Sequence, residues 1–190
     1  MILPILPYGN PILKAKAQEI NKSYHNLKDL IKNMWETMYS ANGVGLAAPQ
    51  IGLSVRIFII DTFPFSEQEE ISKKEAIELS SFKKVFINPK IIEENGRHWD
   101  FNEGCLSIPD IREDISRKES IKIKFLDENF VSKNLNLSGI KARVVQHEYD
   151  HLEGILFTDY LSPFKKRILK SKLNNISRGK IKTDYLMKFK

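Results

Sequence analysis

Two histidines stand four residues apart in the segment His147-Glu148-Tyr149-Asp150-His151, which has the pattern H-E-x-x-H. On a helix, residues four apart lie on one face, so both imidazoles can reach the same cation. Glu148, next to the first histidine, can accept a proton from a water molecule that this cation activates. The alternative is a pair of surface histidines on an ordinary helix. The pattern predicts a helix with a hydrolytic metal site.

The other acidic and imidazole groups show no such spacing. Asp150 can either orient one of the two imidazoles from behind or simply face solvent. His25 and His98 lie outside the motif, and we interpret both as surface residues.

A catalytic metal needs a third protein ligand and one open position. No histidine follows His151, and Glu153 is too close in sequence to act as a distant third ligand. The remaining candidate is Cys105, preceded by Gly104, which permits a close backbone approach. A lone cysteine is more often buried and inert. The two-histidine helix lacks one ligand, however, and this favours a metal thiolate.

Hydrophobic periodicity predicts the elements that must position these residues. An apolar stripe indicates a helix over 21–41, ended by Asn42-Gly43, where glycine would relieve the cost of a left-handed stop. Ser138 would cap a helix over about 139–152, and Pro163 would begin one over about 163–175. Strands are predicted at 55–60, 85–92, 121–126 and around 135–137. Pro89 places the second of these at an edge or a bulge.

Several strands and separated helices favour an α+β fold, with mainly antiparallel sheets packed around the central H-E-x-x-H helix. We expect one catalytic domain over residues 1–163. The acidic stretch 64–81 is the candidate surface insertion, with a short helix, and 164–190 forms a C-terminal helix and tail.

Composition excludes several classes of protein. The chain has 42% hydrophobic and 28% charged residues, which are ordinary globular values. No apolar run is long enough to span a membrane, and the single cysteine points to a reducing compartment. Residues 164–190 carry ten Lys or Arg and one Asp, a net of +9, so the rest of the chain is at −3. This tail is either a solvated helix face or a footprint for a polyanion. Specific DNA recognition is not expected.

Three segments taken together resemble bacterial peptide deformylases: residues 43–50 (GVGLAAPQ), 103–107 (EGCLS) and 146–151 (QHEYDH). The likeness runs from about Leu3 to Pro163. It implies that Cys105, His147 and His151 bind the metal, with water as the fourth ligand. It also implies that Glu148 is the general base and then the acid for the leaving amine.

The resemblance implies further roles around that centre. The Gln50 side chain and the Leu106 backbone N–H would hold the developing oxyanion. Val44 and Gly45 would pair with the substrate backbone, and Arg112 would lie near the bound peptide. We also expect Gly43 to bind the substrate, together with Val144, which lies one helical turn before the motif.

Residue chemistry alone leaves alternatives at four of these positions. Gln50 can be a loop amide satisfied by the backbone, and the glycines around Val44 can form an ordinary turn. Val144 can line a pocket for a methionine side chain or belong to the core. An uncharged amide donor nevertheless suits an oxyanion, where one such contact is worth about 3–4 kcal/mol.

A thiolate with two imidazoles suits Fe(II), Zn(II), Co(II) or Ni(II). The resemblance favours one Fe(II) per chain, with oxygen-sensitive activity. We expect a cytoplasmic metallohydrolase that removes the formyl group from N-formyl-methionyl nascent polypeptides, with the basic tail contacting the ribosome. A metal-dependent peptidase and a binding protein with a structural metal are the rival hypotheses.

Overall fold

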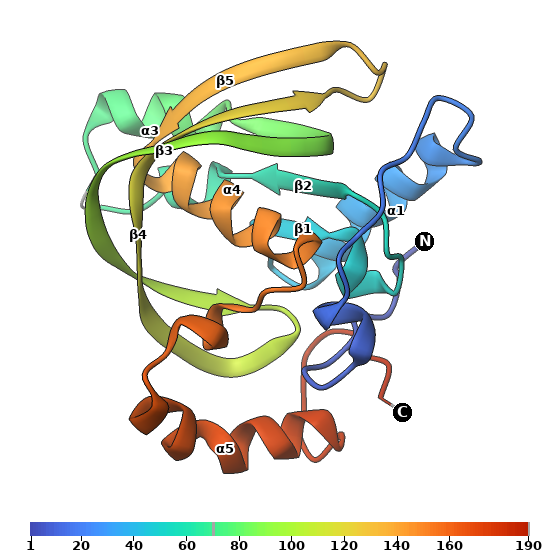
Figure 1. Ribbon diagram of the computed structural model, residues 1–190, viewed down its shortest axis with the longest axis vertical. Coiled ribbons are helices and arrows are strands. Elements are labelled where there is room, and N and C mark those ends of the chain that lie inside the picture. Colours follow the sequence, from blue (N-terminus) through green and yellow to red (C-terminus); the bar gives the residue numbers. More distant parts are fainter. Residues whose placement is uncertain (70, 190) are drawn as a thin grey trace.

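The computed structural model describes residues 1–69 and 71–189 (Figure 1). Within them, five strands form one antiparallel sheet in the order β1-β2-β3-β4-β5. The strands are β1 (Gly45–Ala47), β2 (Ile57–Asp61), β3 (Lys83–Cys105), β4 (Ile108–Leu126) and β5 (Ser132–Ser138). Glu70, within the predicted insertion, and Lys190, at the end of the predicted tail, lie outside the described residues.

The α-helices of the described residues are α1 (Leu27–Ser40), α2 (Phe63–Ser66), α3 (Lys73–Ser80), α4 (Gly139–Leu152) and α5 (Pro163–Ser177). Three short 3₁₀ segments join them: η1 (Pro11–Lys14), η2 (Ala48–Ile51) and η3 (Phe157–Tyr160). None of these helices has the length and apolarity needed to cross a membrane. The predicted α+β class is confirmed.

The long strands β3 and β4 bend around α4, which lies in the middle of the molecule (Figure 1). Their pairing is interrupted by register shifts, one of which falls between Ile87 and Lys90. Such irregularities add a local bend and twist to a strand. The predicted bulge at Pro89 is therefore confirmed. Of the two predicted alternatives, the bulge is the one found, because β3 as a whole pairs with β2 on one side and with β4 on the other.

Helix α4 is buried because the sheet covers it on several sides. Ala142, Val145 and Leu152 join the inner faces of the strands in one core cluster. A second cluster lies between α1 and the β1–β2 strands, with Met34 and Met38 fully buried. A third joins the turn end of the β3–β4 hairpin to η3 and α5. The helix that carries the histidine motif is thus fixed by the central core.

The predicted boundaries of α4 agree with the structure, although the Ser138 side chain makes no capping hydrogen bond. The first helix begins at Leu27, later than the predicted residue 21, because Asn26 has a left-handed backbone with φ 56°. The predicted left-handed residue at the end of this helix is also wrong. The left-handed residue is Asn42, at φ 53°, and not the following Gly43.

The two short helices α2 and α3 fall within or beside the acidic stretch 64–81. The continuous strands over 93–120 were not predicted. Residues 92–98 are exposed and mostly polar, so their apolar periodicity is too weak to indicate a strand. Pairing along the whole hairpin supplies the regularity that the local sequence does not show.

Candidate active site

Helix α4 and the end of β3 bring together three side chains that could hold a metal ion. His147 and His151 lie one turn apart, with ring centroids separated by 5.1 Å. The Cys105 Sγ atom lies 3.3 Å from His151 Nε2. One ligand atom from each of the three residues lies within 4.8 Å of the other two. Among the residues that the structure describes, no other group of three His, Cys, Asp or Glu side chains has this geometry.

A buried carboxylate fixes the orientation of the first imidazole. Glu103 Oε2 lies 2.9 Å from His147 Nδ1, which leaves Nε2 directed toward the thiol side of the site. Burial lowers the pKa of His147, but contacts with Cys105 and Glu103 outweigh it and raise that pKa well above its usual value. A carboxylate behind a ligating histidine selects the ring tautomer and its direction. Sequence reasoning missed this role of Glu103.

Two arginines compensate the buried charge of Glu103. Arg117 donates to it from Nε at 2.7 Å, and Arg143 donates from Nη1 at 3.0 Å. Arg117 also donates to Asp150 at 2.6 Å, and the Tyr160 hydroxyl donates to the same Asp150 oxygen at 2.9 Å. Neither predicted role of Asp150 is correct, because it is buried and pairs with an arginine instead of an imidazole or solvent.

Glu148 is the one acid of the site that is left without a partner. Its side chain is buried, and its Oε2 atom has no hydrogen-bond partner among the described residues. Burial is the main cause that raises the pKa of Glu148 to about 7. A carboxyl group with such a pKa can accept and return a proton near neutral pH. By contrast, Glu153 pairs with Arg56 at 2.6 Å, away from the metal ligands.

Gly45 makes room for the Glu148 carboxylate. A Cβ atom added at Gly45 would lie 2.3 Å from Oε1 and 2.7 Å from Cδ of Glu148. Gly45 has no positive φ, so the requirement is space and not backbone conformation. Gly43 has a similar relation to Leu106, whose Cδ1 would lie 2.8 Å from an added Cβ. The interpretation as an ordinary turn does not account for these two glycines.

The contacts of Gln50 are compatible with both predicted roles, a loop amide bonded to the backbone and a donor to an oxyanion. Its Oε1 accepts a hydrogen bond from the Ala47 N–H at 2.8 Å, as expected of a loop amide. Its Nε2 faces the opposite way and lies 3.5 Å from Cys105 Sγ and 3.4 Å from Ser107 Oγ. The backbone thus holds the carbonyl end, while the amide donor points at the site.

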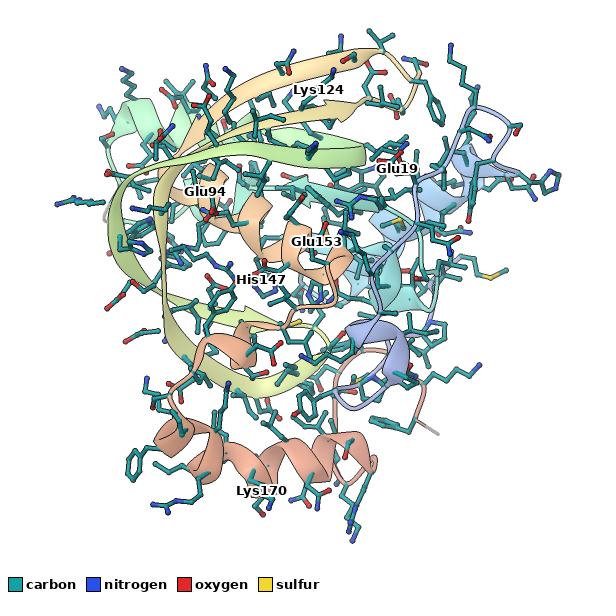
Figure 2. The ribbon with its side chains drawn as sticks, in the orientation of Figure 1. Glu19, Glu94, Lys124, His147, Glu153 and Lys170 are labelled. Atoms are coloured by element: carbon teal, nitrogen blue, oxygen red, sulfur yellow. The ribbon has the colours of Figure 1, made fainter. Side chains whose placement is uncertain are left out.

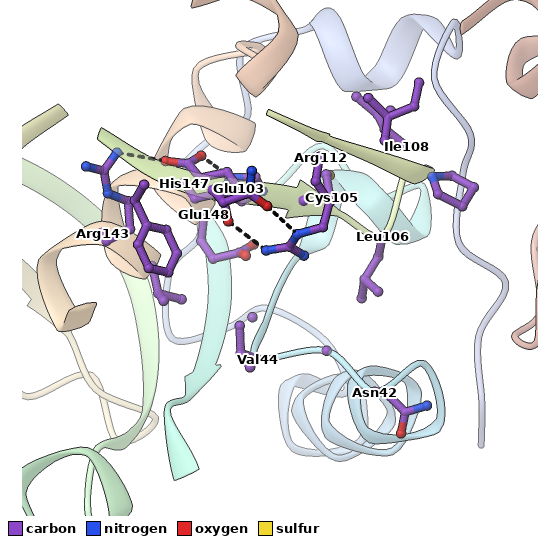
Figure 3. Close-up of a pocket in the computed structure, with 18 of the residues that line it drawn as sticks. Asn42, Val44, Glu103, Cys105, Leu106, Ile108, Arg112, Arg143, His147 and Glu148 are labelled. Atoms are coloured by element: carbon purple, nitrogen blue, oxygen red, sulfur yellow. Dashed lines mark hydrogen bonds and ion pairs between the residues drawn. The ribbon is translucent and has the colours of Figure 1, made fainter. Parts of the chain in front are cut away.

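A cleft of about 470 Å³ opens onto the metal ligands (Figure 3). Of the residues predicted for the site, it is lined by Gly43, Val44, Gly45, Gln50, Cys105, Leu106, Arg112, Val144, His147 and Glu148. His151 lies behind this surface, nearly fully buried. Val144 is also packed in the main core cluster, so it belongs to the core and lines the cleft.

Arg112 crosses the cleft wall on the β3–β4 hairpin. Its guanidinium donates to the side chain and backbone oxygens of Asn102 at 2.9 and 2.6 Å. A Cβ added at Gly104 would lie 2.6 Å from Arg112 Nη1. The close approach predicted at Gly104 is therefore made by the arginine side chain.

The residues present fit a divalent metal. A thiolate and two imidazoles form a borderline-soft donor set with three protein ligands, as catalytic sites have. The unpartnered Glu148 oxygen lies on the same helix and lines the same cleft. A site with three ligands, an open cleft and an unsatisfied carboxylate is arranged for chemistry on a bound molecule.

Comparison with known proteins agrees with this geometry. Residues 2–167 match the family model described as polypeptide deformylase. The chain belongs to this family. The peptide deformylase of Christiangramia forsetii is 59% identical over 189 residues, covering 100% of this chain and 96% of that protein. That of Flavobacterium psychrophilum is 56% identical over 188 residues, covering 99% and 97%.

Solved structures of the deformylase family have the same fold. The peptide deformylase from Legionella pneumophila aligns with a TM-score of 0.79 at 34% identity, covering 95% of this chain and 98% of that one. The enzyme from Thermotoga maritima aligns with a TM-score of 0.74 at 37% identity, covering 86% and 99%. The family predicted from three short segments is confirmed.

Proposed function

We propose that this chain is a metal-dependent hydrolase that removes the formyl group from the N-terminal formyl-methionine of nascent polypeptides and releases formate. Its membership in the deformylase family supports the reaction. The observation that carries the proposal is the unpartnered Glu148 carboxylate beside the Cys105, His147 and His151 group. A structural metal site would not need a buried, unsatisfied acid facing a cleft.

Cys105, His147 and His151 would hold one divalent ion, and we propose Fe(II), with Zn(II), Ni(II) or Co(II) able to occupy the same donors. When bound, such an ion polarises a carbonyl and lowers the pKa of water. Ferrous iron next to a thiolate would make the activity sensitive to oxygen.

The chain's own groups then handle the proton and the charge. Glu148 accepts the proton of the attacking water, whose oxygen forms a bond to the formyl carbon. When the carbon–nitrogen bond breaks, Glu148 returns that proton to the leaving amine. The Gln50 Nε2 group and the Leu106 N–H donate to the oxygen on which negative charge develops.

The edge of the sheet supplies a place for the peptide. β1 is the edge strand next to the cleft, so its outer side can pair with an extended chain. Val44 and Gly45 lie where this pairing would occur. Val144 would contact the methionine side chain, and Arg112 would lie beside the backbone that follows it.

The test is formate release from formyl-Met-Ala-Ser by anaerobically purified, Fe(II)-loaded protein. We expect formate from this peptide, and no new amine from internal bonds of a longer unformylated peptide. Cleavage of the internal bonds without formate release would support the peptidase hypothesis instead. Absence of both reactions in folded, metal-loaded protein would contradict the proposed function.

We further propose a cytoplasmic location and a contact between the basic C-terminal region and ribosomal RNA. Lys166, Arg167, Lys170 and Lys172 are exposed on α5, while Leu169, Leu173 and Ile176 bury its other face. Co-sedimentation with ribosomes should weaken steeply as salt rises. Salt-independent co-sedimentation, or none at low salt, would contradict the contact.

A further inference from the structure

Both ends of the chain reach the two-residue turn between β3 and β4. The Tyr8 N–H donates to the Ser107 carbonyl at 2.8 Å. The Tyr185 hydroxyl donates to the Leu106 carbonyl at 2.7 Å. Ser107 and Leu106 are the two turn residues, and Leu106 also lines the cleft. The turn that follows the cysteine ligand is thus held from outside by segments distant in sequence.

The segment that carries Tyr185 is built into the fold. It runs back from the end of α5 to lie beside the N-terminal segment (Figure 1). The Ile5 N–H donates to the Leu186 carbonyl at 2.9 Å, and the Lys188 N–H donates to the Ile5 carbonyl at 3.0 Å. Tyr185 and Met187 pack against the core cluster of α1 and the β1–β2 strands. This double anchor gives the Tyr185 hydroxyl a fixed position.

We infer that Tyr185 is a positioning residue for the oxyanion donor on Leu106. The Leu106 carbonyl and the Leu106 N–H lie in the two peptide planes that meet at the Leu106 Cα. A hydroxyl that holds the carbonyl limits the motion of this turn, and with it the motion of the adjoining plane that carries the N–H. The inference rests on the proposed function, in which that N–H donates to the formyl oxygen. The C-terminal segment then contributes to the rate of the reaction as well as to the packing of the fold.

The contact acts on the transition state more than on substrate binding. Negative charge develops on the formyl oxygen only as the carbonyl is attacked, so a misdirected donor lowers kcat and leaves the binding of the peptide nearly unchanged. Loss of an entire oxyanion donor costs about 10²–10³-fold in kcat. Because Tyr185 only directs the donor, we expect a smaller effect, about 5–20-fold.

The test is Tyr185→Phe in the full-length, metal-loaded protein, with Tyr24→Phe as the matched control. Tyr24 packs against the same core cluster, and its hydroxyl makes no hydrogen bond to the described part of the chain. We expect Tyr185→Phe to lower kcat about 5–20-fold and to change KM less than about twofold. The affinity for the deformylated product peptide, which lacks the formyl oxygen, should not change. Tyr24→Phe should retain the wild-type kcat.

Backbone amide exchange of Leu106 gives a second result that does not depend on activity. We expect faster exchange at Leu106 in Tyr185→Phe than in Tyr24→Phe. A variant with a lower Tm but wild-type kcat and Leu106 exchange would show a purely structural contact and overturn the inference. A higher KM at unchanged kcat would also overturn it. If the wild type releases no formate, the proposed function fails, and the exchange measurement still tests the Tyr185 contact.

Discussion

Helices α4 and α5 have nearly the same length, 14 and 15 residues, but place their polar residues in opposite environments. α4 buries Arg143, Glu148, Asp150 and His151, whereas the buried residues of α5 are apolar. In Figure 2, His147 lies in the interior while Lys170 points away from the body of the molecule.

The difference between the two helices shows how burial changes the protonation chemistry of a charged side chain. Burial removes water from a charged group, so each one must find a partner or shift its pKa. On α4, the carboxylate of Asp150 is neutralised by Arg117 from β4, whereas one oxygen of the Glu148 carboxylate has no partner among the described residues and lies in the cleft. The exposed lysines of α5 remain solvated, so their positive charge needs no buried partner.

Among changes that leave the Glu148 side chain in place, the largest effect is expected from one that disturbs the surroundings of α4. Gly45→Ala places a methyl group within 2.3 Å of the present Glu148 Oε1 position, so the carboxylate must move. Since a positioned general base contributes about 10²–10⁴-fold, we expect kcat to fall by about 10²-fold. Steady-state formate release measures this. Gly52→Ala strains the backbone because φ is 85° there, but its added Cβ has its nearest contact at 3.7 Å, so this variant separates a general loss of stability from the clash with Glu148. Equal kcat values for the two variants would contradict our view of Gly45.

The next effect comes from removing the charge behind His147. Glu103→Gln leaves Arg117 and Arg143 without their shared carboxylate and weakens the hold on the imidazole. We expect metal affinity or activity to fall about 10–100-fold and the free energy of unfolding to fall by about 3–5 kcal/mol. Metal titration and denaturant unfolding measure the two losses. Wild-type metal affinity in a destabilised variant would assign Glu103 to stability alone.

The smallest effect is expected on α5. Lys170→Ala removes an exposed charge that makes no ion pair within the described residues. Surface substitutions of this kind change stability by about 0.5 kcal/mol or less. Formate release from a tripeptide should stay within about twofold of wild type, whereas ribosome co-sedimentation at low salt should decrease. A large loss of activity on the tripeptide would contradict the view that α4 carries the reaction and that α5 contributes only surface charge.

The histidine spacing on α4 could be predicted from the sequence, whereas the contacts that surround these histidines could not. The spacing of the metal-ligand candidates on α4 follows from a local signal, the histidines at i and i+4. Ser138 marks the start of the helix correctly, although its side chain makes no capping hydrogen bond. The partnership of Glu103 with His147 could not be predicted because it joins residues 44 apart in sequence. Arg117 offered one weak signal, since it continues the buried alternation of Ile111 and Ile115 along β4.

Two other misses have local causes. The polar stretch after Ile92 gave no strand pattern, although β3 continues through it to Cys105. Asn42 takes the left-handed position expected of Gly43, because asparagine tolerates that conformation. Gly43 is needed instead for the approach of Leu106, a contact between distant segments that no local pattern indicates.

Formate release by wild-type protein and by Glu148→Ala, compared at equal metal occupancy, tests whether the buried acid on α4 is the general base. Removing the carboxylate should leave the Cys105, His147 and His151 donors in place, so the variant should still bind one metal ion. We predict that its kcat falls about 10²–10⁴-fold, with a Tm close to or above that of the wild type. A variant with full metal occupancy and wild-type kcat would contradict the role of the buried acid on α4.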